Sequence, residues 1–279
     1  MVRAGSGPAP LPVLDFFADW RHATGTTAAA LGDGPTAPTR KFDQIGGAGA
    51  IVIANPGTLG FPADMANILQ VRLQTSNSGY TEPRRTTGIA IPAIGQTRYY
   101  RVYLRVSSET AVSIADPETH PIQDGSSAGQ INHGLWIWHS TGGPGKWTLH
   151  FQQSGTANAY PNYIWIISTP LDYDTTYRIE WFIARTGATT FKTGIRVYDS
   201  AGALLFTSDN FLNPSGVPLS TYMTANDLNF FNVANMAGFN TGSNGLGGAD
   251  WPNLMTYSYQ GGVATSLDTW CGPYNPSNG

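Results

Sequence analysis

The sequence has few charged residues and one cysteine. Charged residues make up 12% of the 279 positions, against roughly 25% in an average soluble protein, and the formal net charge is −3. This balance gives no general attraction to nucleic acid or to an anionic membrane, so we expect neither as a partner. It still leaves room for a local basic groove that binds an acidic glycan. The single cysteine, Cys271, excludes an intrachain disulfide and is predicted to be a small buried side chain.

Long apolar runs are also missing. No window approaches the roughly 18 uninterrupted apolar residues of a membrane span. The opening MVRAGSGPAPLPVLDFF has one arginine and no continuous apolar stretch, so we expect no signal peptide. Residues 1–13, rich in Gly, Pro and Ala, are predicted to form an N-terminal arm, and residues 14–279 a single domain.

Alternating strands are what the chain does contain. In the stretch TYRIEWFIARTGATTFKTGIRVYDSAGALLFTS, which ends at Ser208, the apolar residues recur with the period of two that is typical of half-buried strands. Thr186-Gly187-Ala188 and the residues 199–202 supply turns between three runs. This pattern predicts an antiparallel meander with one apolar and one polar face.

Further short strands are predicted on both sides of this meander, at residues 14–20, 50–54, 68–74, 87–92, 98–107, 133–140, 146–153, 163–168, 227–236 and 254–265. Residues 108–130 are interpreted as a long loop, which is usually functional or well packed at this length. More than ten short strands without a convincing helix predict an all-β protein, an antiparallel β-sandwich or a closed barrel.

Several of these segments together resemble the concanavalin A-like lectin/glucanase jelly roll. The entry segment LDFFADW (residues 14–20) is similar to the opening strand of that superfamily, and an arginine-bearing strand, Tyr99–Val106, precedes the meander. The closing YSYQGGVATS (residues 257–266) looks like the final strand that returns beside the first. The resemblance implies a jelly-roll β-sandwich, but the superfamily includes lectins, glycosidases, polysaccharide lyases and virion surface domains, so it implies no single activity.

The carboxylates do not fit a glycosidase of this superfamily. Such an enzyme presents two carboxylates about 5 Å apart on one strand, typically as E-x-D-x-E. Here the matching strand carries Glu180 alone. Asp172 and Asp174 have a suitable spacing but lie in a predicted turn, where they are solvated acids, a calcium ligand pair or, less in keeping with the turn, a catalytic pair.

A polysaccharide lyase requires a base and a group that neutralises a uronate carboxylate. The resemblance assigns the neutralising role to Arg101 and Arg105, whereas Gln130–His133 only partly matches the Q-x-H strand of the lyases and their Y-x-K-x-G-x-Y strand is absent. His139, His150, Tyr160 and Tyr163 are the candidate bases. The alternative interpretation is that these are polar residues on the wet face of a sheet.

A binding surface needs only aromatic rings that stack on sugars and polar groups that read hydroxyls. The chain has 8 Trp and 13 Tyr, more than one sandwich core needs. The glycan-binding candidates are Trp136, Trp138, His139, Trp147, Tyr160, Tyr163 and Trp165. By alternation about half of the tryptophans belong to the core.

No metal or cofactor is assigned from the sequence. A structural Ca²⁺ is compatible with Asp15, Asp19, Asp33 or Asp250, but there is no EF-hand loop and no His/Cys spacing. We therefore expect a non-catalytic structural or carbohydrate-binding module on a virion (a capsid or tail decoration) or on a cell surface, outside the cell. Its partners would be a glycan, neighbouring subunits, or both, in a homo-oligomer or a larger assembly. The alternative is a polysaccharide lyase acting on an acidic glycan.

Overall fold

The computed structural model describes residues 44–46, 50–71, 80–85, 93–106, 119–125, 132–138, 146–153, 163–166, 169–187, 191–208, 230–237, 255–260 and 270–273. These residues form strands and their connections, with no helix among them, in two antiparallel sheets. The predicted arm of residues 1–13 and the predicted strands at residues 14–20 and 87–92 lie outside the described residues.

The first sheet has eight strands. Along it lie β1 (Gln44–Gly46), β4 (Tyr80–Arg85), β14 (Phe230–Ala237), β6 (Thr119–Gly125), β7 (Asn132–Trp138), β8 (Lys146–Gln153) and β10 (Leu171–Asp172), while β9 (Tyr163–Ile166) also pairs with β8.

The second sheet has seven strands. In order they are β13 (Leu204–Ser208), β12 (Phe191–Tyr198), β11 (Thr176–Arg185), β5 (Thr97–Val106), β15 (Met255–Gln260), β3 (Asn67–Val71) and β2 (Ala50–Ala54). The predicted meander is confirmed as β11–β12–β13, with Glu180 opposite Arg196 in the register. Both sheets contain strands far apart in sequence, as in β5–β15 and β4–β14.

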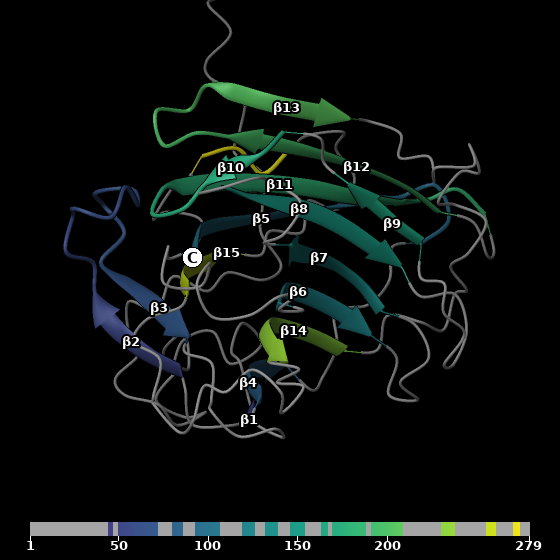
Figure 1. The fold of residues 1–279 in the computed structure, drawn as a ribbon. Coiled ribbons are helices and arrows are strands. Elements are labelled where there is room, and N and C mark those ends of the chain that lie inside the picture. Colours follow the sequence, from purple (N-terminus) through teal and green to yellow (C-terminus); the bar gives the residue numbers. More distant parts are fainter. Residues whose placement is uncertain are drawn as a thin grey trace, which may run out of the picture.

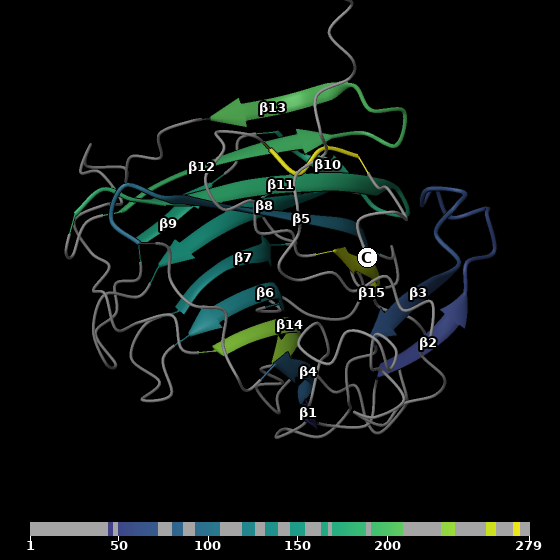
Figure 2. The same cartoon turned by 180° about the vertical axis from the view of Figure 1, so that it is seen from behind.

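The two sheets are stacked face to face (Figures 1 and 2). Trp147 of β8 makes an edge contact with Tyr177 of β11, at 5.9 Å between ring centroids, so these side chains mark the interior of the sandwich. On β11 and β5 the interior residues Ile179 and Val102 are fully buried, as the period-two pattern requires. The predicted antiparallel β-sandwich is thereby confirmed.

Two features of the sequence-based interpretation are corrected. The stretch expected to be a loop, residues 108–130, contains β6, a strand whose Pro121 and Gly125 conceal the pattern. The polar face of β5 and β11 is not solvated, because Tyr99, Arg101 and Glu180 on it are all buried. Something covers this outer face of the seven-stranded sheet.

Candidate functional site

The cover over the outer face of the seven-stranded sheet includes a four-residue strap, Trp270–Pro273. Figure 2 shows it as a short yellow segment beside β11 and β12. The guanidinium of Arg101, which has no exposed surface, donates from Nη1 to the carbonyl oxygens of Gly272 at 2.8 Å and Pro273 at 2.6 Å. In return the amide of Gly272 donates to Oε2 of Glu180 at 3.1 Å. The strap is therefore fixed to the sheet by two kinds of charge-assisted hydrogen bond. A cationic guanidinium donates to its carbonyls, and an anionic carboxylate accepts from its amide.

Glu180 lies at the centre of a basic cluster beneath the strap. It stands opposite Arg101 on β5 and Arg196 on β12, and its Oε1 lies 2.9 Å from Nε of Arg178. Burial raises the pKa of the Glu180 carboxyl above its usual value, while Arg178, the amide of Gly272, Arg101 and Arg196 lower it. Desolvation is the largest of these effects, so the ionised form of the Glu180 carboxyl is less stable in the folded protein than in water.

Aromatic side chains complete the cover. The ring of Trp270 lies 4.1 Å from the guanidinium carbon of Arg196, and its centroid lies 5.5 Å from those of Tyr99 and Phe182. Cys271 packs in the same cluster and is buried, as expected from the sequence. The middle of this outer face is a packed core under the strap.

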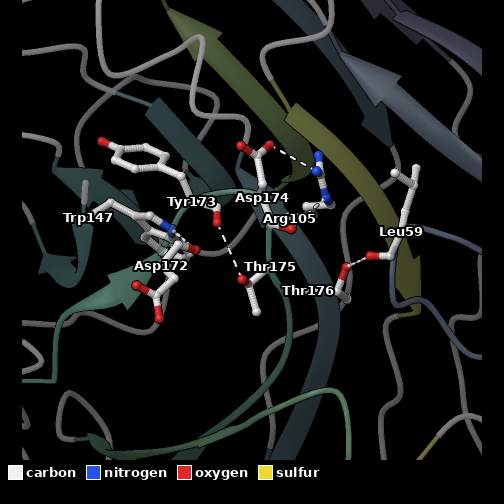
Figure 3. A network of polar contacts seen from close by, with 8 residues as sticks. All are labelled: Leu59, Arg105, Trp147, Asp172, Tyr173, Asp174, Thr175 and Thr176. Atoms are coloured by element: carbon white, nitrogen blue, oxygen red, sulfur yellow. Dashed lines mark hydrogen bonds and ion pairs between the residues drawn. The ribbon is translucent and has the colours of Figure 1, made fainter.

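Arg101 and Arg105 are consequently occupied by protein groups. Arg101 holds the strap, so it is not presented to a uronate as the lyase hypothesis required. Arg105 is directed to the turn after β10: its Nε donates to the carbonyl of Asp174 at 3.1 Å and its Nη2 lies 2.9 Å from Oδ1 of Asp174 (Figure 3).

The two candidate carboxylates, at the end of β10 and in the turn after it, point to different partners. Asp172 pairs with the ammonium of Lys146, whereas Asp174 pairs with Arg105. Asp174 also has a φ of 58°, and its amide donates to the carbonyl of Val106 at 2.8 Å, so the turn is held by its backbone. Asp174 lies in the expected surface turn, whereas Asp172 belongs to the short strand β10, and the two carboxylates are directed to different cations. In the described parts of the chain, no group of three or more His, Cys, Asp or Glu could hold a metal ion.

The eight-stranded sheet distributes the remaining candidates over two faces. Trp147 is fully buried in the interior, and its Nε1 donates to the carbonyl of Asp172 at 3.0 Å. It is therefore a core residue, and its assignment to a glycan surface is corrected. In the register of β8 and β9, Trp165 lies opposite Phe151 and Tyr163 opposite Gln153. Both share the interior-facing side of the sheet with Trp147.

Trp136, Trp138 and His150 take the opposite positions. Trp136 pairs with His150 and Trp138 with Thr148, so all three candidates lie on the outer face of the eight-stranded sheet. Thr148 is 3% exposed, which shows that this face is covered near Trp138. The proposed lyase group does not converge, because Arg101 and Arg105 belong to the outer face of the other sheet. His139 and Tyr160, and the acids Asp15, Asp19, Asp33 and Asp250, lie outside the described residues.

A row of polar residues on this outer face was missed by sequence reasoning. The register places five residues directly opposite one another on consecutive strands: Arg84 of β4, Asn232 of β14, Gln123 of β6, Gly134 of β7 and Gln152 of β8. Trp136 and His150 lie two residues further along β7 and β8 on the same face. One arginine, three amides and an adjacent Trp–His pair are thus brought to one surface from strands that are far apart in the chain.

No family model matches the sequence, and neither does any curated protein. Solved structures with a similar fold include an endo-β-1,4-glucuronan lyase from the fungus Trichoderma reesei, at 12% identity and a TM-score of 0.48 over 81% of this chain and 91% of that one. The alginate lyase Aly36B matches at 10% identity and a TM-score of 0.45, over 94% of this chain and 99% of the lyase.

A further match is the CBM2 module of the evolved Dit protein of Lactobacillus casei BL23 phage J-1. It has 10% identity and a TM-score of 0.40, over 93% of this chain and 99% of the module. These likenesses concern the fold alone. The two antiparallel sheets of the chain form the β-sandwich expected from the sequence.

Proposed function

We propose that the protein is a carbohydrate-binding module whose ligand face is the outer face of the eight-stranded sheet. The observation that carries the proposal is the register row of Arg84, Asn232, Gln123 and Gln152 beside the Trp136–His150 pair. Amide groups both donate and accept, which suits the hydroxyls of a sugar, and an indole ring offers an apolar face to the C–H groups of a pyranose.

The ligand that fits this row best is an acidic glycan. An arginine at one end of a line of amides can bind a carboxylate through two parallel hydrogen bonds. The opposite outer face is a poorer candidate, since the strap covers its centre and Arg101 is bonded to main-chain carbonyls. The protein would work on a virion or a cell surface.

Binding to a panel of acidic and neutral polysaccharides tests this proposal. We expect binding to an acidic member, with affinity reduced about tenfold or more by Arg84→Ala, since a hydrogen bond to a charged group contributes about 1.5–3 kcal/mol. Gln152→Ala should weaken binding to a smaller extent. Lys192→Ala is the matched control, because Lys192 is an exposed cation on the other sheet. An equal loss in Lys192→Ala and Arg84→Ala would contradict the assignment of the face.

A lyase acting on the same glycan is a second candidate, favoured by the position of His150. This histidine lies on the same face as Gln152, two residues along β8 and at the far end of the row from Arg84, where a base would stand beside a uronate whose carboxylate accepts from the amide of Gln152. An eliminating enzyme leaves an unsaturated uronate that absorbs in the ultraviolet. Rising absorbance that is abolished by His150→Ala would establish the lyase, and binding without any rise would establish the non-catalytic module.

A further inference from the structure

A cavity of about 490 Å³ lies on the outer side of the seven-stranded sheet, beside the strap and away from the proposed glycan face. Tyr103 of β5 and Arg178 of β11, which are opposite each other in the register, form its base. Its walls are residues 60–63, the turn of residues 199–202, and Pro273 of the strap. Its volume is suited to one small ligand rather than to a polymer.

Each wall of the cavity is fixed by hydrogen bonds. Nδ2 of Asn55 donates to the carbonyls of Pro62 at 3.0 Å and Met65 at 2.9 Å, which shapes the loop of residues 60–63. In the facing turn, the amide of Ala203 donates to Oδ1 of Asp199 at 2.8 Å. The carbonyl of Pro273 is held by Arg101. The cavity is therefore preformed, and a ligand would not have to order its walls.

The base of the cavity holds a fixed cation. The guanidinium of Arg178 stacks on the ring of Tyr198, 3.9 Å from its centroid, and its Nε lies beside Glu180. The terminal nitrogens of Arg178 donate no hydrogen bond to any described residue, and 12% of its side chain is exposed. Three arginines surround the one carboxylate of Glu180, so this end of the cavity carries an excess of positive charge.

The rim of the cavity carries an acid. Oδ1 of Asp199 accepts the amide of Ala203, whereas within the described part of the chain Oδ2 has no hydrogen-bond donor. A carboxylate on the rim can accept from ligand hydroxyl groups. It also repels a dianion, so a ligand with a single negative charge is favoured over phosphate or sulfate.

We propose that this cavity binds a hydroxylated six-membered ring that carries one carboxylate. The carboxylate would accept from the terminal nitrogens of Arg178 in the planar geometry that guanidinium groups favour, and a ring hydroxyl would donate to Asp199. The apolar edges of Pro62 and Pro273 line the remaining space. This site is distinct from the polar row of the eight-stranded sheet and does not depend on it.

Saturation-transfer NMR with D-glucuronate as the probe tests the proposal. We expect transfer from glucuronate, and little or none from D-glucose, which lacks the carboxylate, or from benzoate, which lacks the hydroxyls. Ala63→Trp, which fills the cavity from its wall, should weaken glucuronate binding about tenfold or more. Ala93→Trp is the matched control, because Ala93 is an exposed alanine in a turn that does not line the cavity.

A variant of Asp199 on the rim tests whether the cavity prefers a carboxylate to other anions. Asp199→Asn keeps an oxygen for the amide of Ala203 but removes the negative charge, so phosphate should displace glucuronate from this variant better than from the wild type. The proposal is overturned if glucuronate shows no transfer, if Ala63→Trp binds it as well as Ala93→Trp does, or if phosphate displaces it equally from wild type and Asp199→Asn. Neither Ala63 nor Ala93 lies on a strand of the eight-stranded sheet, so the comparison of Ala63→Trp with Ala93→Trp keeps this test apart from that of the glycan face.

Discussion

Arg101 and Gly272, 171 positions apart in the chain, are joined by a hydrogen bond of 2.8 Å from a fully buried guanidinium to a main-chain carbonyl. Arg101 resembles a ligand-binding residue in the sequence, but in the structure this contact makes it the residue that holds the strap. It closes the centre of one outer face of the sandwich and leaves the other outer face as the candidate for a glycan.

Arg101→Ala should destabilise the fold strongly. Removing one partner of a buried charged network costs about 3–5 kcal/mol, because Glu180 and the carbonyls of the strap lose a buried donor. Arg105→Ala should cost about 1 kcal/mol or less, since Asp174 is 43% exposed and its ion pair is screened by solvent. Urea denaturation of the two variants measures both values, and equal losses would contradict the role of Arg101.

The thiol of Cys271 reports on the strap without a stability measurement. Because it is the single cysteine of the chain and is buried in the strap, the wild type should react slowly with a thiol reagent under native conditions. Arg101→Ala should speed the reaction many-fold, and Arg105→Ala should leave it near the wild-type rate. Fast labelling of the wild type would show that Arg101 does not hold the strap closed.

Glu180 should make stability depend on pH in a defined direction. Its pKa is higher in the folded protein than in the unfolded chain, so its contribution to stability is full below the unfolded value and is lost as the pH rises through the folded one. Relative to Glu180→Gln, the wild type should therefore lose unfolding free energy as the pH rises through the range above about 4.3, the usual pKa of a glutamate. A difference that is constant across this range, or that grows in favour of the wild type, would contradict a raised pKa for Glu180.

Substitution of Trp147 should affect stability, whereas substitution of Trp136 should affect glycan binding. Trp147→Ala removes a fully buried ring and should cost about 3–5 kcal/mol of unfolding free energy. Trp136→Ala, on the outer face, should instead weaken glycan binding more than it changes stability. Denaturation curves and glycan titrations of both variants test this contrast. If Trp136→Ala destabilises the fold more and Trp147→Ala weakens glycan binding more, the assignment of the two faces of the eight-stranded sheet is wrong.

The parts of the fold that sequence predicted are those with local signals. The meander of β11, β12 and β13 has a recurring period of two and Gly187 and Gly202 in its turns, so its strands can be recognised without their partners in the fold. β4 (YTEPRR) and β6 (THPIQDG) carry proline and charge in place of apolar alternation, so neither strand was recognised. Their positions follow from pairing with β14, which is far away in the chain.

The candidate site was less predictable for the same reason. Which side of a strand faces the interior depends on the other sheet, so nothing local distinguishes Trp147, which contacts Tyr177, from Trp136. Likewise, no local feature of RYYRVYLRV shows that Arg101 is covered by residues 270–273. Arg84, Gln123 and Asn232 form a row only through the register of three strands.

Hydrogen–deuterium exchange with a bound acidic glycan tests the central claim most directly, because it locates the ligand on one of the two sheets. We expect slower exchange in β6, β7, β8 and β14 when the glycan is added, with β11 and β12 unchanged. Protection confined to β11, β12 and the strap would place the ligand on the opposite face and contradict the assignment of the glycan to the eight-stranded sheet.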